Sequence, residues 1–395
     1  MSADVLFDLT ALDTPIRFGG TGRYIQELGA ALDALDDRER EGLVIRGLQR
    51  IDGDEEGLVW PAEPREPRIA SETRYVMQRR LRLPRTLRRL RPALFHAPFR
   101  VGTPRGSFVP RVVTCLDLVP FVLPEEYFGN RWAYRRLHMA AEAARYHGAA
   151  RVLCISQHTA DDLMRVLRVP ARKIDVALLG VDLARYRVFS GAEAEAAAAV
   201  RARHGLRDQG YVFYMGRADP RKNVDVLVAA FARARVPDLE LVIIGHVRPS
   251  DEQAYERALA AAGRPAGVRF LGFVPEEDLP AILGGALGFV FCSTYEGFGN
   301  VPIEAAACGC PVITTGVTSM RETIADVAFT VPPRDVEATA AAIRRLATEP
   351  SLRRDLALAG LRRAASFSWR NTALGTVACY ARALRNLGAH RPGAA

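Results

Sequence analysis

The stretch Tyr295-Glu-Gly-Phe-Gly-Asn-Val-Pro-Ile-Glu304 follows an apolar run at residues 287–291. The run predicts a buried strand, and Pro302 predicts the first turn of a helix. Glycines in such a connection let the backbone turn sharply and approach a ligand, and the free N–H groups of a helix N-terminus attract anions. Glu296 and Glu304 would then bracket a site for hydroxyl-rich and anionic groups. An ordinary connection with two solvated acids is the alternative that this stretch alone leaves open.

Strand and helix candidates alternate on both sides of this stretch. Strands are expected at residues 5–9, 43–48, 93–96, 109–118, 151–155 and 174–179, and again at 211–215, 239–245, 268–273, 288–291, 311–314 and 328–331. Helices are expected at 25–35, 131–146, 159–167, 192–203, 225–235, 251–262, 276–283, 303–307, 335–347, 352–366 and 369–387. This alternation predicts an α/β protein with two doubly wound units, each a parallel sheet covered by helices on both faces.

Composition narrows the class further. Apolar residues make up 49% and charged residues 25% of the 395, as in a soluble globular protein, and no run approaches the roughly 18 uncharged residues of a membrane span. The start, Met-Ser-Ala-Asp-Val-Leu, has no basic segment or cleavage site of a secretory signal. Six cysteines without paired spacings predict reduced thiols in a cytoplasmic protein, and no cysteine or histidine set predicts a metal site.

The positive charge is concentrated between Arg65 and Arg91, where ten arginines accompany two acids. Leucines at positions 81, 83, 87 and 90 alternate with the arginines, which predicts one or two short amphipathic helices. Two interpretations stay open: a peripheral contact with an anionic membrane surface, or a solvated face. No aromatic platform accompanies the charge, so nucleic acid is not an expected partner.

The segment Met215-Gly-Arg-Ala-Asp-Pro-Arg-Lys-Asn-Val-Asp225 also joins a strand end to a helix through a glycine. It presents Arg217 and Lys222 where a diphosphate needs fork donors and a point charge. A solvated basic turn is the alternative. Neither half of the chain has a G-x-G-x-x-G after its first strand, and a P-loop is absent, so a dinucleotide is not the expected ligand.

Three motifs together carry a resemblance: Gly216-Arg-x-Asp-x-Arg-Lys-Asn223, Glu296-x7-Glu304 and Ala307-Cys-Gly-Cys-Pro-Val-Ile313. They resemble the retaining GT-B glycosyltransferases that use nucleotide sugars, the glycosyltransferase group 1 family of bacterial mannosyltransferases and glycogen-synthase-like enzymes. Other family-like segments are residues 18–24, 112–120, 179–182 and 367–369, so the resemblance extends from about residue 4 to residue 387.

The resemblance implies two Rossmann-like domains that face each other across a cleft. Residues 1–185 would bind the acceptor and residues 186–367 the nucleotide-sugar donor, while a C-terminal helix at 368–390 would return to the first domain. It implies transfer of a hexose, mannose from GDP-mannose being the first choice and a UDP-sugar the other, to a glycan or lipid-linked acceptor in surface-polysaccharide biosynthesis.

The resemblance also implies roles for single residues. Arg217 and Lys222 would hold the donor diphosphate and neutralise the leaving nucleoside diphosphate, with no metal and no other cofactor. Glu296 would face the sugar hydroxyls, and Glu304 would bind the ribose. Further donor-binding positions are Gly216, Gly297, Phe298, Gly299, Asn300 and Val301, and, from the first domain, Gly20, Thr21 and Gly22.

The sequence departs from the family in two places. Many relatives carry a histidine before the aspartate that ends the strand at 109–118, whereas Leu116 precedes Asp117 here. Asp117 becomes the nearest polar candidate for catalysis, and His96 and His158 are the histidines that could replace the missing one. The second is the segment Ser319-Met-Arg-Glu322, where relatives often have a proline, a change expected to be minor. Leu116 keeps open the alternative of a catalytically silent GT-B protein that binds nucleotide or glycan as a partner subunit.

Overall fold

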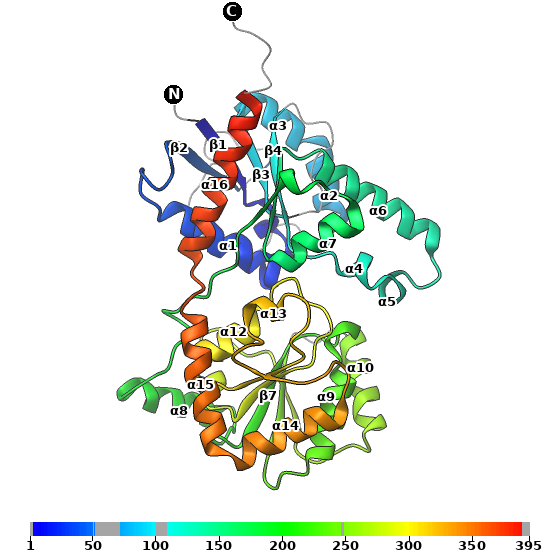
Figure 1. Cartoon of the computed structure of the whole chain (residues 1–395), viewed down its shortest axis with the longest axis vertical. Coiled ribbons are helices and arrows are strands. Elements are labelled where there is room, and N and C mark those ends of the chain that lie inside the picture. The colour runs from blue at the N-terminus through cyan, green and yellow to red at the C-terminus, as the bar shows by residue number, and fades with distance from the viewer. Residues whose placement is uncertain (1–2, 50, 52–71, 100–108, 246–248, 389–395) are drawn as a thin grey trace, which may run out of the picture. The chain divides into compact units, whose positions relative to one another are not determined.

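The computed structural model describes residues 3–49, 51, 72–99, 109–245 and 249–388. The chain forms two compact units: unit 1 comprises Met1–Gly180 and Trp369–Ala395, and unit 2 comprises Val181–Ser368. Figure 1 follows the chain from blue to red through both. The chain leaves unit 1, builds the whole of unit 2 and then adds its last helix, α16 (Trp369–Gly388), to unit 1.

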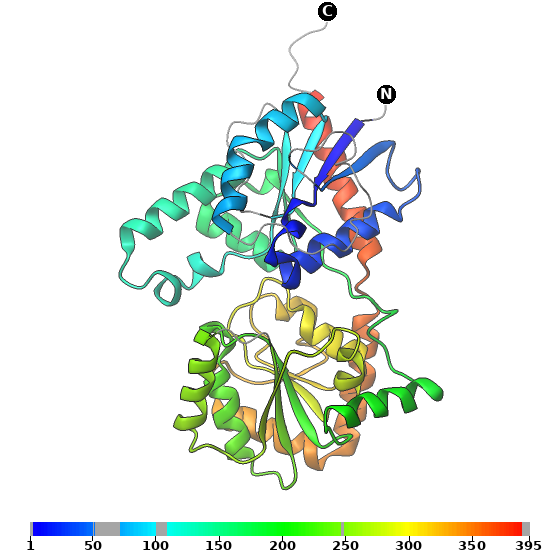
Figure 2. The ribbon, with the colours of Figure 1, turned by 180° about the vertical axis from the view of Figure 1, so that it is seen from behind.

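Unit 1 is built on a parallel six-stranded sheet in the order β2-β1-β3-β4-β5-β6. The strands are β1 (Ala3–Asp8), β2 (Leu43–Leu48), β3 (Leu94–Ala97), β4 (Arg111–Cys115), β5 (Arg151–Cys154) and β6 (Ile174–Val176). The helices are η1 (Thr10–Asp13), η2 (Pro15–Phe18), α1 (Gly20–Asp33), α2 (Glu72–Leu81), α3 (Leu83–Leu90), α4 (Val119–Val122), α5 (Pro124–Phe128), α6 (Trp132–His147), α7 (Gln157–Leu167), η4 (Ala171–Lys173) and α16. Helices α1 and α16 pack together on one face of the sheet, and α3, α6 and α7 cover the other (Figures 1 and 2).

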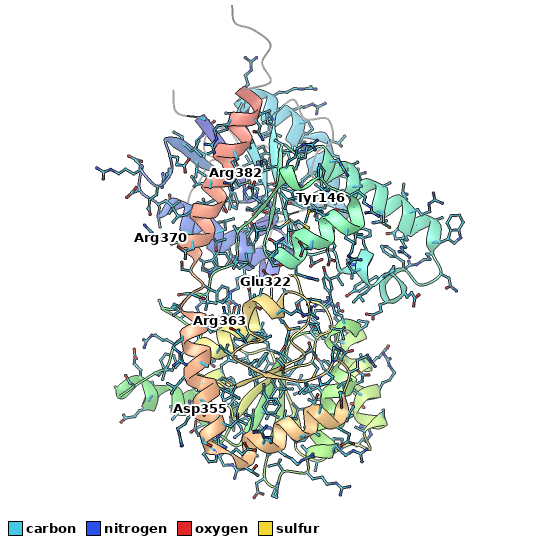
Figure 3. The ribbon with its side chains drawn as sticks, in the orientation of Figure 1. Tyr146, Glu322, Asp355, Arg363, Arg370 and Arg382 are labelled. Carbon is cyan, nitrogen blue, oxygen red and sulfur yellow. The ribbon has the colours of Figure 1, made fainter. Side chains whose placement is uncertain are left out.

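A chain of buried polar groups fixes α1 and α16 to this sheet. His96 Nδ1 lies 2.6 Å from the hydroxyl of Tyr380 on α16, and His96 Nε2 lies 2.8 Å from Thr114 Oγ1 on β4. Tyr24 of α1 shares the same threonine hydroxyl at 2.9 Å. Two residues further along α16, Arg382 (labelled in Figure 3) pairs with Asp175 at 2.7 Å. The last helix is therefore an integral part of unit 1.

The arginine-rich segment forms α2 and α3, although its first part, residues 65–71, lies outside the described residues. Arg79 is not on a solvated or lipid-facing surface as expected, because it is 1% exposed and its Nη2 lies 2.6 Å from Asp8 Oδ2. Leu83 and Leu87 are buried in the core, whereas Leu81 is 63% exposed. The apolar face of α3 thus packs against its own sheet.

Unit 2 repeats the design with the order β12-β11-β10-β7-β8-β9, again all parallel. Its strands are β7 (Tyr211–Met215), β8 (Glu240–Ile244), β9 (Val268–Gly272), β10 (Gly288–Phe291), β11 (Val312–Thr314) and β12 (Phe329–Thr330). Its helices are α8 (Ala192–Arg203), η5 (Pro220–Lys222), α9 (Val224–Ala234), α10 (Pro249–Ala261), α11 (Leu279–Gly284), α12 (Asn300–Ala307), α13 (Met320–Thr323), α14 (Val336–Thr348) and α15 (Pro350–Ala364). Helices α9, α10 and α14 pack side by side, as do α12 and α15.

The expected α/β alternation is confirmed in both units, but two glycine-bearing segments differ. Helix α1 begins at Gly20 rather than at residue 25, and α12 begins at Asn300 rather than near residue 303. A glycine in the first helical turn costs little, because the N–H groups there have no helical partner in any case. All six cysteines are buried and free. Within the described residues no helix is long and apolar enough to cross a membrane.

Candidate active site

The strand order of unit 2 places a ligand crevice beside β7. The chain moves from β7 to β8 and β9 on one side, and then returns to β10 on the other side. In open α/β sheets a ligand binds outside the carboxyl ends of the strands at such a reversal. The loop after β7 carries Gly216, Arg217 and Lys222, and the loop after β10 carries Glu296 and Gly297. The fold thus brings the two motifs from distant parts of the sequence to one edge.

Hydrogen bonds fasten these two loops to each other. Thr294 N donates to the carbonyl oxygen of Arg221 at 2.8 Å, and Asn223 Nδ2 donates to the carbonyl oxygen of Cys292, also at 2.8 Å. Asn223 is buried with φ +49°, a left-handed conformation that asparagine tolerates better than most residues. Arg334 Nη1 donates to its Oδ1 at 2.6 Å. Hydrogen bonds therefore hold the loop after β7 and the loop after β10 together.

Lys222 has no hydrogen-bond or ion-pair partner among the described residues. Its ammonium lies 5.4 Å from the ring centroid of Phe291, and no described residue accepts a hydrogen bond or forms an ion pair with it. A Cβ on Gly216, whose φ is +155°, would come 2.8 Å from Lys222 Nζ, so glycine makes the room for this ammonium. Burial lowers the pKa of Lys222, while the charge of Glu296 opposes that shift. A half-buried cation that lacks its anion fits a phosphate.

Glu296 is ionised and held from several sides. Its Oε1 lies 2.5 Å from Arg221 Nη1 and accepts a 2.9 Å hydrogen bond from Ser293 Oγ. Burial alone would raise the pKa of Glu296, but the charges of Lys222 and Arg221 lower it below its ordinary value. The backbone is fixed too, because Ser319 Oγ donates to the Glu296 carbonyl oxygen at 2.9 Å.

Arg217 is placed differently from its expected partner Lys222. Its side chain is 46% exposed, and its Nε lies 3.2 Å from Asp251 Oδ2 on α10. The loop backbone beside it is held by two tyrosines, since Tyr255 donates to the Gly216 carbonyl oxygen at 2.9 Å and Tyr214 to that of Arg217 at 3.0 Å. A diphosphate contact by Arg217 would have to compete with Asp251.

The other donor-binding candidates of unit 2 surround the start of α12. Gly299 has φ +90° and caps this helix, whose first two residues are Asn300 and Val301. The ring of Phe298 is buried in edge contact with Phe367 at 5.7 Å, so only its backbone can meet a ligand. Glu304 lies one turn further along and is 2% exposed. The helix start presents free N–H groups, as expected for an anion site.

In unit 1 the expected glycine loop is the first turn of a helix. Gly20 is exposed and Thr21 half-buried at the start of α1, whereas Gly22 is buried. A Cβ on Gly22 would come 2.3 Å from the Cα of Arg17 in η2. Gly22 is therefore required for the packing of η2 against α1, while a contact of Gly20 and Thr21 with the donor stays a prediction.

At the carboxyl end of β4, Asp117 has a structural partner. Its Oδ1 accepts a 3.3 Å hydrogen bond from Val119 N and so caps α4, while Leu116 is half-buried. His96 cannot replace the absent histidine, because both ring nitrogens are engaged and burial lowers its pKa to about 3. His158 lies 3.2 Å from Asp162 one turn later in α7.

Two residues of the unit 2 site were missed by the sequence reasoning. Arg221 adjoins Lys222, and its contact with Glu296 depends on a backbone direction that spacing does not reveal. Ser319 was named only as part of a segment that departs from the family, and its hydroxyl donates to the Glu296 carbonyl oxygen at 2.9 Å.

Comparisons with known proteins identify the family of this chain. Residues 198–363 match the family described as "Glycosyl transferases group 1", and residues 18–185 match "Glycosyltransferase Family 4". The O-antigen chain mannosyltransferase B of Escherichia coli is 32% identical over 277 residues, which cover 68% of this chain and 69% of that protein. The chain belongs to the group 1 glycosyltransferases.

This group 1 glycosyltransferase is also similar to a second curated relative and to a solved structure. A D-inositol 3-phosphate glycosyltransferase of Salinispora arenicola is 35% identical over 254 residues, covering 61% of this chain and 56% of that protein. Sucrose-phosphate synthase from Thermosynechococcus elongatus superposes with a TM-score of 0.73 at 23% identity, covering 98% of this chain and 99% of that one. The fold is therefore GT-B, as expected, while the names of these relatives differ in what they act on.

Proposed function

We propose that this glycosyltransferase moves a hexose from a nucleotide sugar to a glycan or lipid-linked glycan acceptor in surface-polysaccharide biosynthesis. The observation that carries the donor class is the unpartnered ammonium of Lys222 beside the ionised Glu296. The name of the O-antigen relative supports mannose, with GDP-mannose as the first donor to test and UDP-sugars as the other candidates.

The proposed transfer retains the anomeric configuration and uses no metal ion. The bond from sugar C1 to the diphosphate oxygen breaks, the acceptor oxygen bonds to C1 on the same face, and the acceptor proton passes to the departing phosphate. Lys222 and the N–H groups at the start of α12 would stabilise the negative charge on that phosphate. Asp117 is then not needed as a base, which agrees with its hydrogen bond to Val119 N.

The experiment is a panel of nucleotide sugars scored for binding by calorimetry and for slow donor hydrolysis. We expect one nucleotide to bind tightly and one sugar on it to be released. Failure of every nucleotide sugar to bind would end the proposal. The alternative, a silent partner subunit, is favoured by the apolar Leu116, and binding without turnover on any glycan acceptor would support it.

We also propose that unit 1 rests on an anionic lipid surface. Unit 1 contains 32 basic and 23 acidic residues, a formal charge of +9, whereas unit 2 contains 22 of each. On α6, Trp132 and Leu137 are 69% and 68% exposed beside the exposed Arg136. Tyr146, labelled in Figure 3, lies on the buried side of this helix. An apolar pair flanked by arginine suits a membrane interface.

Vesicle sedimentation tests this second proposal. We expect the protein to sediment with vesicles that contain phosphatidylglycerol but not with phosphatidylcholine alone, and the double variant Trp132→Ser/Leu137→Ser to bind several-fold more weakly. Phe273→Ser, which removes an 80% exposed side chain from unit 2, is the matched control. Equal binding by both variants would remove α6 from the contact.

A further inference from the structure

The three cations of the loop after β7 have three different surroundings. Arg217 pairs with Asp251 and is largely exposed. Arg221 pairs with Glu296, and the two side chains are only 15% and 13% exposed. Lys222 has no acceptor among the described residues. Three neighbouring positive charges that look equivalent in the sequence therefore cannot share one role.

Arg221 is held on both its main chain and its side chain. Its carbonyl oxygen accepts hydrogen bonds from Thr294 N at 2.8 Å and from Thr294 Oγ1 at 3.1 Å. Its Nη1 donates to the carbonyl oxygen of Tyr295 at 2.6 Å, and the same nitrogen lies 2.5 Å from Glu296 Oε1. The Arg221 guanidinium thus contacts both the carbonyl oxygen of the residue before Glu296 and the Glu296 carboxylate.

Both contacts that the structure gives to the Glu296 carboxylate fall on one oxygen. Ser293 Oγ lies 2.9 Å from Oε1, and Arg221 Nη1 lies 2.5 Å from the same oxygen. Together they engage Oε1 twice, whereas no hydrogen bond or ion pair from a described residue reaches Oε2. A carboxylate held in this way presents one defined oxygen to a ligand, and preorganised acceptors of this kind discriminate between hydroxyl geometries.

We propose that Arg221 is a positioning residue, which with Ser293 occupies Glu296 Oε1 and so commits Oε2 to the hydroxyls of the transferred sugar. This inference rests on the proposed donor function. Arg221 acts on recognition of the sugar and Lys222 on the diphosphate, so the two neighbours serve different parts of the same ligand.

The test separates recognition of the sugar from recognition of the diphosphate. It compares the binding of a nucleoside diphosphate with the binding of the matching nucleotide sugar. Affinities for GDP and GDP-mannose, and for UDP and UDP-glucose, are measured by calorimetry for the wild type, Arg221→Lys, Arg221→Met and Ser293→Ala. Arg221→Lys keeps the charge but loses the fork geometry. The control is Arg233→Met, which removes the exposed pair of Arg233 with Glu337. Thermal midpoints confirm that each variant is folded.

We expect Arg221→Lys and Arg221→Met to weaken the nucleotide sugar by about tenfold or more, while the nucleoside diphosphate changes by less than about threefold. Ser293→Ala should follow the same pattern with a smaller effect. Equal weakening of both probes would overturn the positioning role and make Arg221 a phosphate ligand or a general structural residue. Wild-type affinity for both probes in the Arg221 variants would overturn it as well. A wild type that binds none of the four would instead overturn the donor function, and the positioning role with it.

Discussion

Arg79 Nη2 lies 2.6 Å from Asp8 Oδ2, and the two side chains are only 1% and 4% exposed. Thr10 Oγ1 completes the group, because it accepts from Arg79 Nη1 at 2.6 Å and donates to Asp8 Oδ1 at 2.7 Å. The pair joins α2 to the carboxyl end of β1, immediately before the turns that lead into α1. Because both side chains are almost fully buried, solvent could not solvate either charge if its partner were removed.

Replacement of Arg79 by methionine should therefore destabilise unit 1 strongly. An unpaired buried carboxylate costs about 3–5 kcal/mol in the free energy of unfolding. The double variant Asp8→Asn/Arg79→Met should recover part of that loss, because it leaves no buried charge. Urea denaturation measures both, with Arg233→Met as the exposed control. A loss for Arg79→Met no larger than that of the control would contradict the buried pair.

Lys222→Ala should reduce turnover by about 10²- to 10³-fold and leave the fold intact, because it removes the cation assigned to the leaving diphosphate. The chain has only two lysines, and the other, Lys173, donates to the carbonyl oxygen of Ala149 at 2.9 Å. Lys173→Ala is thus a matched control that should affect stability rather than turnover. In wild type, GDP or UDP should protect Lys222 but not Lys173 from an amine-reactive reagent, as read by mass spectrometry. Similar protection of both would argue against the diphosphate role.

The acid limb of the pH profile should depend on Arg221. The charged groups that face Glu296 are Arg221 and Lys222 of η5, while burial keeps the nearby Tyr214 neutral by raising its pKa. Since the pKa of Glu296 is lowered, its ionised form persists below the ordinary glutamate range, and kcat/KM should fall only as the pH drops through that lowered value. Arg221→Met should move the fall to higher pH, and Arg221→Lys should move it less. An unchanged limb in Arg221→Met would show that Glu296 does not control it.

His96 should contribute a pH dependence of stability, not of catalysis. Burial lowers its pKa to about 3, whereas an unfolded histidine titrates near 6.5. Between these values the unfolded chain binds a proton that the folded chain does not, so stability should fall as the pH drops from about 6.5 towards 3. His96→Gln should flatten this dependence, as measured by urea denaturation at about pH 7.5 and pH 5. The same slope in both proteins would contradict a buried neutral imidazole.

The sequence predicted the parallel α/β design because buried strands are short apolar runs with turn residues at their ends. It located the strands of both units to within a few residues, and the repeated pattern predicted two parallel sheets but not their strand order. It failed at Gly20, where a glycine-rich segment opens a helix. Nothing local separates such a segment from a loop, since glycine is acceptable in both.

The sequence named the candidate site residues but not the contacts between them. Lys222 and Glu296 were named from motifs. The different surroundings of Arg221 and Lys222 depend on the backbone conformation of η5, which the motifs do not reveal. Arg79 was grouped with surface arginines because its partner, Asp8, is distant in the sequence. Pairings of this kind are made by tertiary structure, and they leave no periodic signal.

The contribution of α16 to unit 1 has a consequence for biosynthesis. Unit 2 is one continuous segment, so all of it is synthesised before α16. Unit 1 is split between both ends, and the buried imidazole of His96 must wait for Tyr380 before its hydrogen bonds are complete. The part of unit 1 that is synthesised before unit 2 therefore cannot complete its native contacts until this last helix has been made.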